Sequence, residues 1–227
     1  MNRLRGFVRT SSLSLFFGVL FLVALVGQAV AGWSQLNAEQ AASGLGHYSW
    51  WQYLGSAAFA VDVVENWQSE YLQFLLYIVL TVWLLQRGSP ESKEPDQAGQ
   101  ETEKDQKIGR HSDEDSPAWA RTGGWRTGVY SWSLAGVMGA LFTVSWLAQS
   151  IAGRAAFNEQ RLEQLQDPIG WAAYVQNADF WSRTLQNWQS EFLAVGTMVV
   201  FSIYLRQRGS PESKPVGSPH SSTGIEG

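Results

Sequence analysis

The chain has 227 residues, enough for one modest domain or two small ones. Its formal net charge of -4 provides no basic excess of the kind that phosphate backbones require, so nucleic acid is not expected as a partner. The absence of cysteine excludes disulfides, thiolate nucleophiles and thiolate metal sites.

Four apolar segments predict an all-α membrane protein with four transmembrane helices. Each segment has about 20 residues, which as a helix spans about 30 Å and matches the hydrocarbon core of a bilayer. Each is apolar on nearly all its faces, whereas a long helix of a soluble bundle keeps polar residues on one face. The predicted spans are residues 13–32, 67–86, 131–153 and 188–207.

The first span has two interpretations. Arg3, Arg5 and Arg9 precede it, and it ends in Ala29-Val30-Ala31, which also fits a cleavable signal peptide. The third span has the same layout in mid-chain, where a signal peptide cannot lie. The sequence therefore favours an uncleaved anchor helix.

The loops after the first and third spans are rich in Trp, Tyr and Phe. We predict short helices near residues 49–54 and 169–175. Ser56 and Asn177 are good N-cap residues, so a longer helix should begin after each of them. The aromatic content favours short interfacial helices on the outer membrane surface, with a lid over a binding site as the alternative.

The linker at residues 88–120 and the tail at residues 209–227 contain no apolar run and are rich in Ser, Glu, Asp, Lys and Pro. Such segments bury too little apolar area to offset the entropy of ordering, so disorder is predicted, with a tether or a docking segment as the role. Lys and Arg concentrate in the N-terminal stretch, the linker and the tail. The positive-inside rule then predicts a multi-pass protein of the cytoplasmic (inner) membrane with both termini cytoplasmic.

The chain contains an internal repeat at a constant offset. Asn66-Trp67-Gln68-Ser69-Glu70 recurs 121 positions later as residues 187–191, and residues 86–93 recur at 207–214. Each copy is a helical hairpin with an even number of spans, so both copies should cross the membrane in the same direction as parallel-oriented repeats. The predicted domains are a first membrane repeat at 1–87, the linker at 88–120, a second membrane repeat at 121–208 and the tail at 209–227.

The candidate site is a polar cluster near the outer ends of the spans. A carboxylate at the depth of Glu70 or Glu191 is costly unless it is paired, hydrated or protonated. Gln28 and Gln149 share that depth, so a Gln-to-Glu hydrogen bond is predicted within each half. The alternative is structural, because Glu favours helix N-termini and Gln and Asn join helices. The cluster comprises Gln28, Glu70, Gln149, Glu191, Asn66 and Asn187.

Small residues one turn apart let helix backbones approach closely. Ser14 and Gly18 have this spacing in the first span, and Ala135 and Gly139 have it at the same positions of the third. We therefore predict that the first and third spans face each other as the central pair.

No catalytic motif occurs in a suitable context, and His47, His111 and His220 are scattered. The sequence thus predicts no enzyme activity, no metal site and no cofactor.

The repeated Asn-Trp-Gln-Ser-Glu box at the start of a span, with its Gln-Arg-Gly-Ser-Pro-Glu-Ser-Lys exit, resembles an uncharacterised family of bacterial multi-pass membrane proteins, a domain of unknown function. The resemblance covers nearly all of the chain outside the linker and tail. It implies a bacterial membrane protein and no particular activity. The two halves depart from one another where residues 62–65 of the first half, Asp-Val-Val-Glu, become Arg-Thr-Leu-Gln at 183–186, so the two outer loops need not have equal roles.

Two functions fit these features. The first is an integral membrane protein with a structural or accessory role. The second is a small-solute or proton-coupled transporter acting as a homodimer, because four helices are few for a transporter. The expected partners are the lipid bilayer and a second copy of the chain.

Overall fold

A computed structural model describes residues 2–225, with side chains from residue 6 onward. All regular structure in these residues is helical, so the all-α prediction is confirmed. The helices are α1 (Asn2–Thr10), α2 (Ser12–Ala42), α3 (Trp50–Leu54), α4 (Ala57–Leu80), α5 (Ala118–Thr122), α6 (Gly124–Ser131), α7 (Ser133–Glu163), α8 (Trp171–Tyr174) and α9 (Ala178–Tyr204), with 3-10 turns η1 (Pro95–Gln97) and η2 (Gly109–His111).

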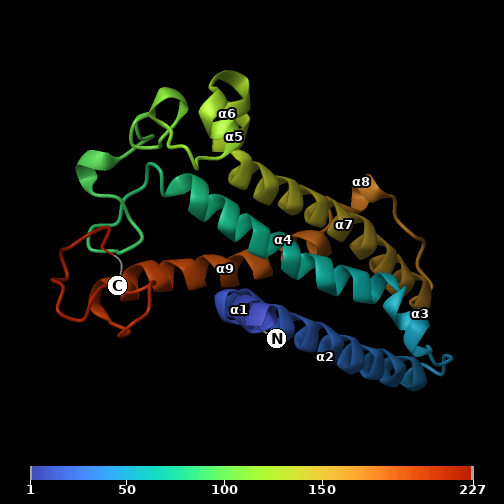
Figure 1. The fold of residues 1–227 in the computed structure, drawn as a ribbon. Helices are drawn as coiled ribbons and strands as arrows, with labels where there is room; N and C mark the ends of the chain where they lie inside the picture. The colour runs from blue at the N-terminus through green and yellow to red at the C-terminus, as the bar shows by residue number, and fades with distance from the viewer. Residues whose placement is uncertain (1, 226–227) are drawn as a thin grey trace.

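Four long helices, α2, α4, α7 and α9, form an elongated bundle (Figure 1). The short helices α3 and α8 lie toward one end, while the linker with α5 and α6 and the C-terminal tail lie toward the other. Helix α4 packs along α7 more extensively than any other pair of helices does, and it also contacts α9. This places α4, from the first half, at the centre of the bundle.

The predicted central pairing of the first and third spans is wrong. Helix α7 packs on α4, where a side chain built at Gly139 would be in van der Waals contact with Leu75. Ser14 is exposed, and Gly18 on α2 faces open space. Small residues permit a close approach but do not select which helix makes it.

Two helices, and not the predicted four, are long and apolar enough to span a membrane: α2 and α7. Helices α4 and α9 are long enough but less apolar: each begins about ten residues before its predicted span and ends before that span does, at Leu80 and Tyr204, so part of the apolar run lies outside the helix. Their polar boxes, residues 66–70 and 187–191, therefore lie inside the helices and not near their ends.

The predicted helix starts in the outer loops are confirmed. The Ser49 hydroxyl accepts a hydrogen bond from the Gln52 backbone N–H, forming a capping box at the start of α3. Ser56 caps α4 through the Phe59 N–H, and Asn177 caps α9 through the Asp179 N–H. The second short helix, α8, is shorter than the predicted 169–175.

Residues 121 positions apart make the same contacts in the two halves. The Asn37 side chain donates to the Tyr48 carbonyl (3.1 Å) and accepts from the Tyr48 N–H (2.7 Å). Asn158 bonds the backbone of Ile169 in the same way, at 3.0 and 2.9 Å. Each asparagine thus holds its outer loop against the first long helix of its half.

A tyrosine and a glycine meet in each half. Tyr53 and Tyr174 are almost completely buried, and a side chain added at Gly32 or Gly153 would collide with the corresponding hydroxyl. Only glycine leaves room for the ring at these positions. Each tyrosine thereby fixes its short helix against α2 or α7.

The predicted disorder of the linker and tail stays a prediction. In the structure both exits turn at a glycine with positive φ, Gly88 and Gly209, a conformation that glycine adopts without strain. The tail folds back onto the first exit, where the buried Lys214 ammonium donates to the carbonyls of Gly88 (2.6 Å), His220 (3.0 Å) and Ser222 (3.1 Å). These bonds connect the exits of the two halves.

Candidate functional site

The two halves meet through an ion-pair cluster between α4 and α9. The Arg183 guanidinium lies 3.2 Å from Glu65, 3.5 Å from Asp179 and 3.9 Å from Asp62. Asp62 and Arg183 occupy equivalent positions of the two repeats but carry opposite charges. The contact between them is therefore attractive.

The cluster contains three carboxylates and one guanidinium. Burial raises the pKa of Asp62 and of Glu65, and the nearby Arg183 opposes this shift in both. The Tyr174 hydroxyl donates to Asp179 at 2.9 Å, and burial together with that carboxylate raises the tyrosine pKa. The cluster therefore has more negative than positive groups and is suited to holding a proton on a carboxyl group.

A second layer of polar contacts joins the halves one to two turns further along α4. The Trp188 indole N–H donates to the Gln68 carbonyl oxygen at 2.8 Å, and Gln68 is completely buried. The Ser69 hydroxyl donates to the Glu191 carboxylate at 3.3 Å. Of the predicted cluster, Glu191 is the member whose side chain forms a hydrogen bond with the other half among the described residues.

The predicted Gln-to-Glu hydrogen bonds are not formed. The Gln149 amide donates to the Thr184 hydroxyl at 3.4 Å, seven residues before Glu191 on α9, a distance of about 10 Å along a helix. The equivalent of Thr184 in the first half is Val63, which cannot accept a hydrogen bond. Within the described chain, Gln28 has no hydrogen-bond partner for this reason.

The other predicted site residues lie apart from this network. Glu70 is exposed and has no ion pair or hydrogen bond in the part of the chain that the structure describes. Asn66 donates to the Asp62 carbonyl and Asn187 to the Arg183 carbonyl, one turn back on their own helices. Each asparagine therefore forms this bond within its own helix and not with the other half.

Two buried amide atoms on the facing helices α4 and α7 have no partner among the described residues. They are the Gln68 Nε2, a donor, and the Gln149 Oε1, an acceptor. Buried polar atoms are normally bonded, so each of these atoms carries a cost of burial.

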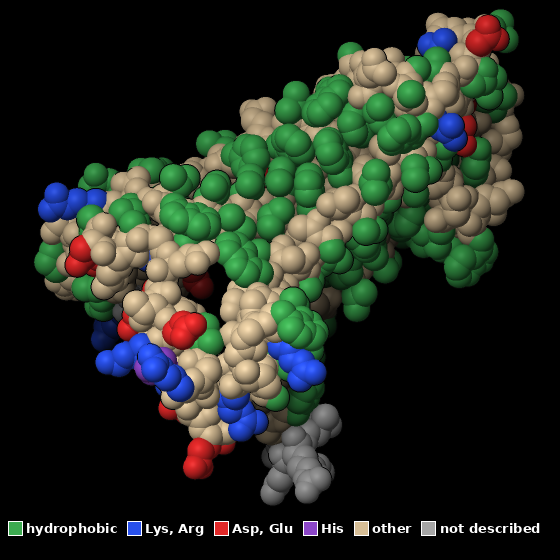
Figure 2. Space-filling view, turned by 90° about the horizontal axis from the view of Figure 1, so that it is seen from above, with side chains coloured by type: hydrophobic (Ala, Val, Ile, Leu, Met, Phe, Trp, Pro, Cys, Tyr) green, Lys and Arg blue, Asp and Glu red, His purple; other side chains and the backbone are tan. Residues whose placement is uncertain are grey.

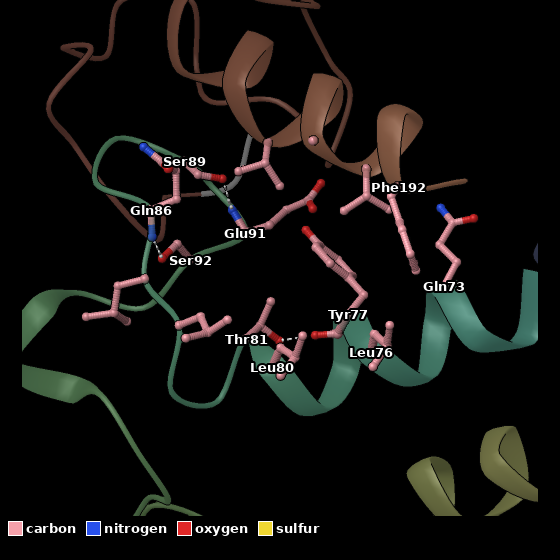
Figure 3. Close-up of a pocket in the computed structure, with 15 residues that line it drawn as sticks. Gln73, Leu76, Tyr77, Leu80, Thr81, Gln86, Ser89, Glu91, Ser92 and Phe192 are labelled. Carbon is pink, nitrogen blue, oxygen red and sulfur yellow. Dashed lines mark hydrogen bonds between the residues drawn. The ribbon is translucent and has the colours of Figure 1, made fainter. Parts of the chain in front are cut away.

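Between α4 and α9, beyond the Ser69 contact, lies an apolar pocket of about 380 Å³ (Figure 3). Its walls are Leu76, Tyr77 and Leu80 of α4 and Phe192 of α9, and the first exit lines it at Gln86 to Ser92. The Tyr77 hydroxyl is directed toward Glu91 and is buried without a hydrogen-bond partner among the described residues. The arrangement can hold an apolar or amphipathic molecule with one polar group.

Sequence reasoning missed the residues that make the closest contacts between the halves. Asp62 and Arg183 were visible as a difference between the copies, and their opposite charges at one repeat position were the available signal. Gln68 and Trp188 belong to the two copies of the repeated Asn-Trp-Gln-Ser-Glu box. The repeat alone does not show which residues of one half contact the other half. Tyr77 carried no signal. No group of His, Asp and Glu that could hold a metal ion occurs in the described residues.

A family model described as a domain of unknown function (DUF6766) matches residues 4–225. No curated protein and no solved structure matches the chain. The match covers both halves together with the linker and most of the tail.

Proposed function

The chain belongs to the DUF6766 family, and we propose that it is a four-span membrane protein with a structural or accessory role and no catalytic activity. The observation that carries the proposal is a long apolar surface on helices that pack little against the rest of the chain. In α2, Leu13, Phe16 and Val23 are exposed to 71%, 60% and 65%. Exposed apolar surface on this scale needs a covering, and hydrocarbon supplies it.

The distribution of charge supports the same proposal. Figure 2 shows hydrophobic side chains along the length of the elongated body, while the Lys, Arg, Asp and Glu side chains on that face gather at its two ends. A protein that crosses a bilayer has this pattern, because charges within the hydrocarbon region are costly.

We include α4 and α9 in the bilayer although their composition is less apolar. Gln68 and Ser69 of the α4 box face the protein and are 0% and 1% exposed, whereas Asn66 and Glu70 lie on its exposed side. Side chains that do face outward include Phe74 on α4 and Phe201 on α9. A helix that buries its polar residues against neighbouring helices can present an apolar surface to lipid.

For orientation we propose cytoplasmic termini in a bacterial inner membrane. Of the sixteen basic residues, three lie between the two predicted spans of one repeat, all of them in the second repeat: Arg154, Arg161 and Arg183. Reporter fusions at Gly99 and Asn158 are expected to lie on opposite sides, with Gly99 cytoplasmic. If both reporters lie on one side of the membrane, the four-span topology is wrong.

One observation favours a second candidate, a small-solute or proton-coupled transporter. The pocket between α4 and α9 lies next to Ser69 and Glu191, so a polar contact and an apolar cavity adjoin each other between the halves. Transporters built from repeats place their substrate at such an interface.

Replacing Glu70 and Glu191 together with Gln separates the two candidates. For a structural role we expect no proton or solute flux from the unaltered protein in liposomes, and a melting temperature that falls by a few degrees because the Ser69 contact weakens. Flux in the unaltered protein that disappears in the double variant, with unchanged melting, would establish the transporter. A Glu212→Gln variant, altered in the exposed tail, is the matched control.

A further inference from the structure

The face of α9 that corresponds to the α7-binding face of α4 is uncovered. Leu72 of α4 is 8% exposed, whereas its counterpart Leu193 on α9 is 68% exposed. Leu75 contacts Gly139 of α7, whereas its counterpart Gly196 has no neighbour within 4 Å of an added side chain. The same helical surface is therefore packed in the first half and open in the second.

The matching surface on α2 is open as well. Gly18 is the counterpart of Gly139, and nothing lies within 4 Å of a side chain added there. If α2 lay on α9 as α7 lies on α4, Gly18 would face Gly196. Two glycines at the contact point would allow an even closer approach than the Leu75–Gly139 pair does.

The relation between the halves identifies the missing helix. One rotation superimposes the first half on the second, so that α4 falls on α9. The same rotation moves α7, which packs on α4, to a position against α9. The helix expected at that position is the first helix of another hairpin. That helix would be α2 of the same chain only if the rotation were a half-turn. In the structure α2 does not lie there, since nothing is within 4 Å of a side chain added at Gly18 or at Gly196, so the rotation is not a half-turn.

We propose that α9 receives α2 from a second copy of the chain, and that the two copies exchange these contacts reciprocally. The exchange closes a two-chain ring of four helical hairpins, because a head-to-tail interface either closes into a ring or continues as a filament. It would cover the open faces around Gly18 and Gly196 in both copies. This assembly rests on the membrane insertion proposed above and adds the interface and its occupant.

The chain has no cysteine, so any crosslink must join cysteines that were introduced by substitution. Membranes that contain two differently tagged copies, one with Gly18→Cys and one with Gly196→Cys, should give a crosslinked heterodimer on mild oxidation or with a short bis-maleimide. In the control, the first copy carries Val23→Cys in place of the Gly18 substitution, and the yield of heterodimer should fall at least tenfold. Val23 and its counterpart Val144 are each 65% exposed and face away from the proposed α2–α9 contact and from the α4–α7 contact. A Leu75→Cys/Gly139→Cys chain should crosslink within itself.

A crosslink confined to a single chain that carries both Gly18→Cys and Gly196→Cys would show that α2 closes on its own α9. A heterodimer yield equal to the Val23→Cys control would show that lipid covers both faces. Either result overturns the proposal. As a second measurement, Gly18→Trp should give monomers in detergent where Val23→Trp keeps dimers. The fraction of protein that stays in the membrane after carbonate extraction measures membrane insertion separately. An inserted protein that forms no dimer contradicts the assembly alone, whereas a protein that carbonate extracts contradicts the proposed function.

Discussion

Arg183→Met is expected to lower the free energy of unfolding in detergent by about 2 kcal/mol at neutral pH. Removing one partner of a buried ion pair costs about 3–5 kcal/mol, and the loss is smaller here because the Arg183 and Asp62 side chains are 33% and 45% exposed. The variant leaves Asp62, Glu65 and Asp179 together without a counter-charge. Chemical denaturation followed by tryptophan fluorescence measures the loss.

The loss should be smaller at pH 5 than at pH 7.5. Burial already raises the pKa of Asp62 and Glu65 in the folded chain, and removal of Arg183 raises both further. A carboxyl group with a raised folded pKa binds more protons folded than unfolded, so stability falls as pH rises from its ordinary range through the raised value. Arg208→Met, at an exposed position, should change stability at neither pH. An equal loss at both pH values would contradict the role given to the carboxylates.

Gly153→Ala and Tyr174→Phe are expected to couple strongly. Alanine at 153 would collide with the Tyr174 hydroxyl, and overfilling a packed site costs about 1–3 kcal/mol. Tyr174→Phe alone loses the hydrogen bond to Asp179, worth about 1.5–3 kcal/mol. The double variant should be less destabilised than the sum of the two by at least about 1 kcal/mol, because the missing hydroxyl makes room for the methyl group.

Gly136→Ala is the matched control on the same helix. Nothing lies within 4 Å of a side chain added at Gly136, so this variant should be as stable as the parent or more stable by up to about 1 kcal/mol through helix propensity. Additive losses in the Gly153 and Tyr174 cycle would mean that the ring and the glycine do not meet. The corresponding double-mutant cycle at Gly32 and Tyr53 should give a coupling energy of the same sign, since the first half makes the same contact.

Local chemistry explains which parts of the fold were predictable. The starts of α3, α4 and α9 followed from Ser49, Ser56 and Asn177, because a capping side chain acts within three residues of itself. The apolar runs of α2 and α7 were visible for the same reason. The early starts of α4 and α9 were missed because amphipathic turns precede their apolar runs, and a search for unbroken apolar stretches passes over such turns.

Contacts between helices were less predictable, because they depend on register. Placing Gln149 level with Glu191 required knowing how α7 and α9 align along their axes, and each residue of error in that alignment moves the match by about 1.5 Å. The real register brings Gln149 to Thr184. Arg183 illustrates the remaining difficulty: its charge difference from Asp62 was apparent, but only the packing of α4 on α9 shows that the two side chains meet.

The contact of the tail with the first exit has a consequence for the wall of the pocket. The bond from the Gly88 N–H to Thr223 joins residues 135 positions apart, whereas the Asn37 bonds to Tyr48 span 11. We expect the tail to detach at lower free energy than any helix unfolds, since exposed segments open before packed ones. The first exit lines the cavity beside Tyr77, so release of the tail from Gly88 would free one part of the cavity wall.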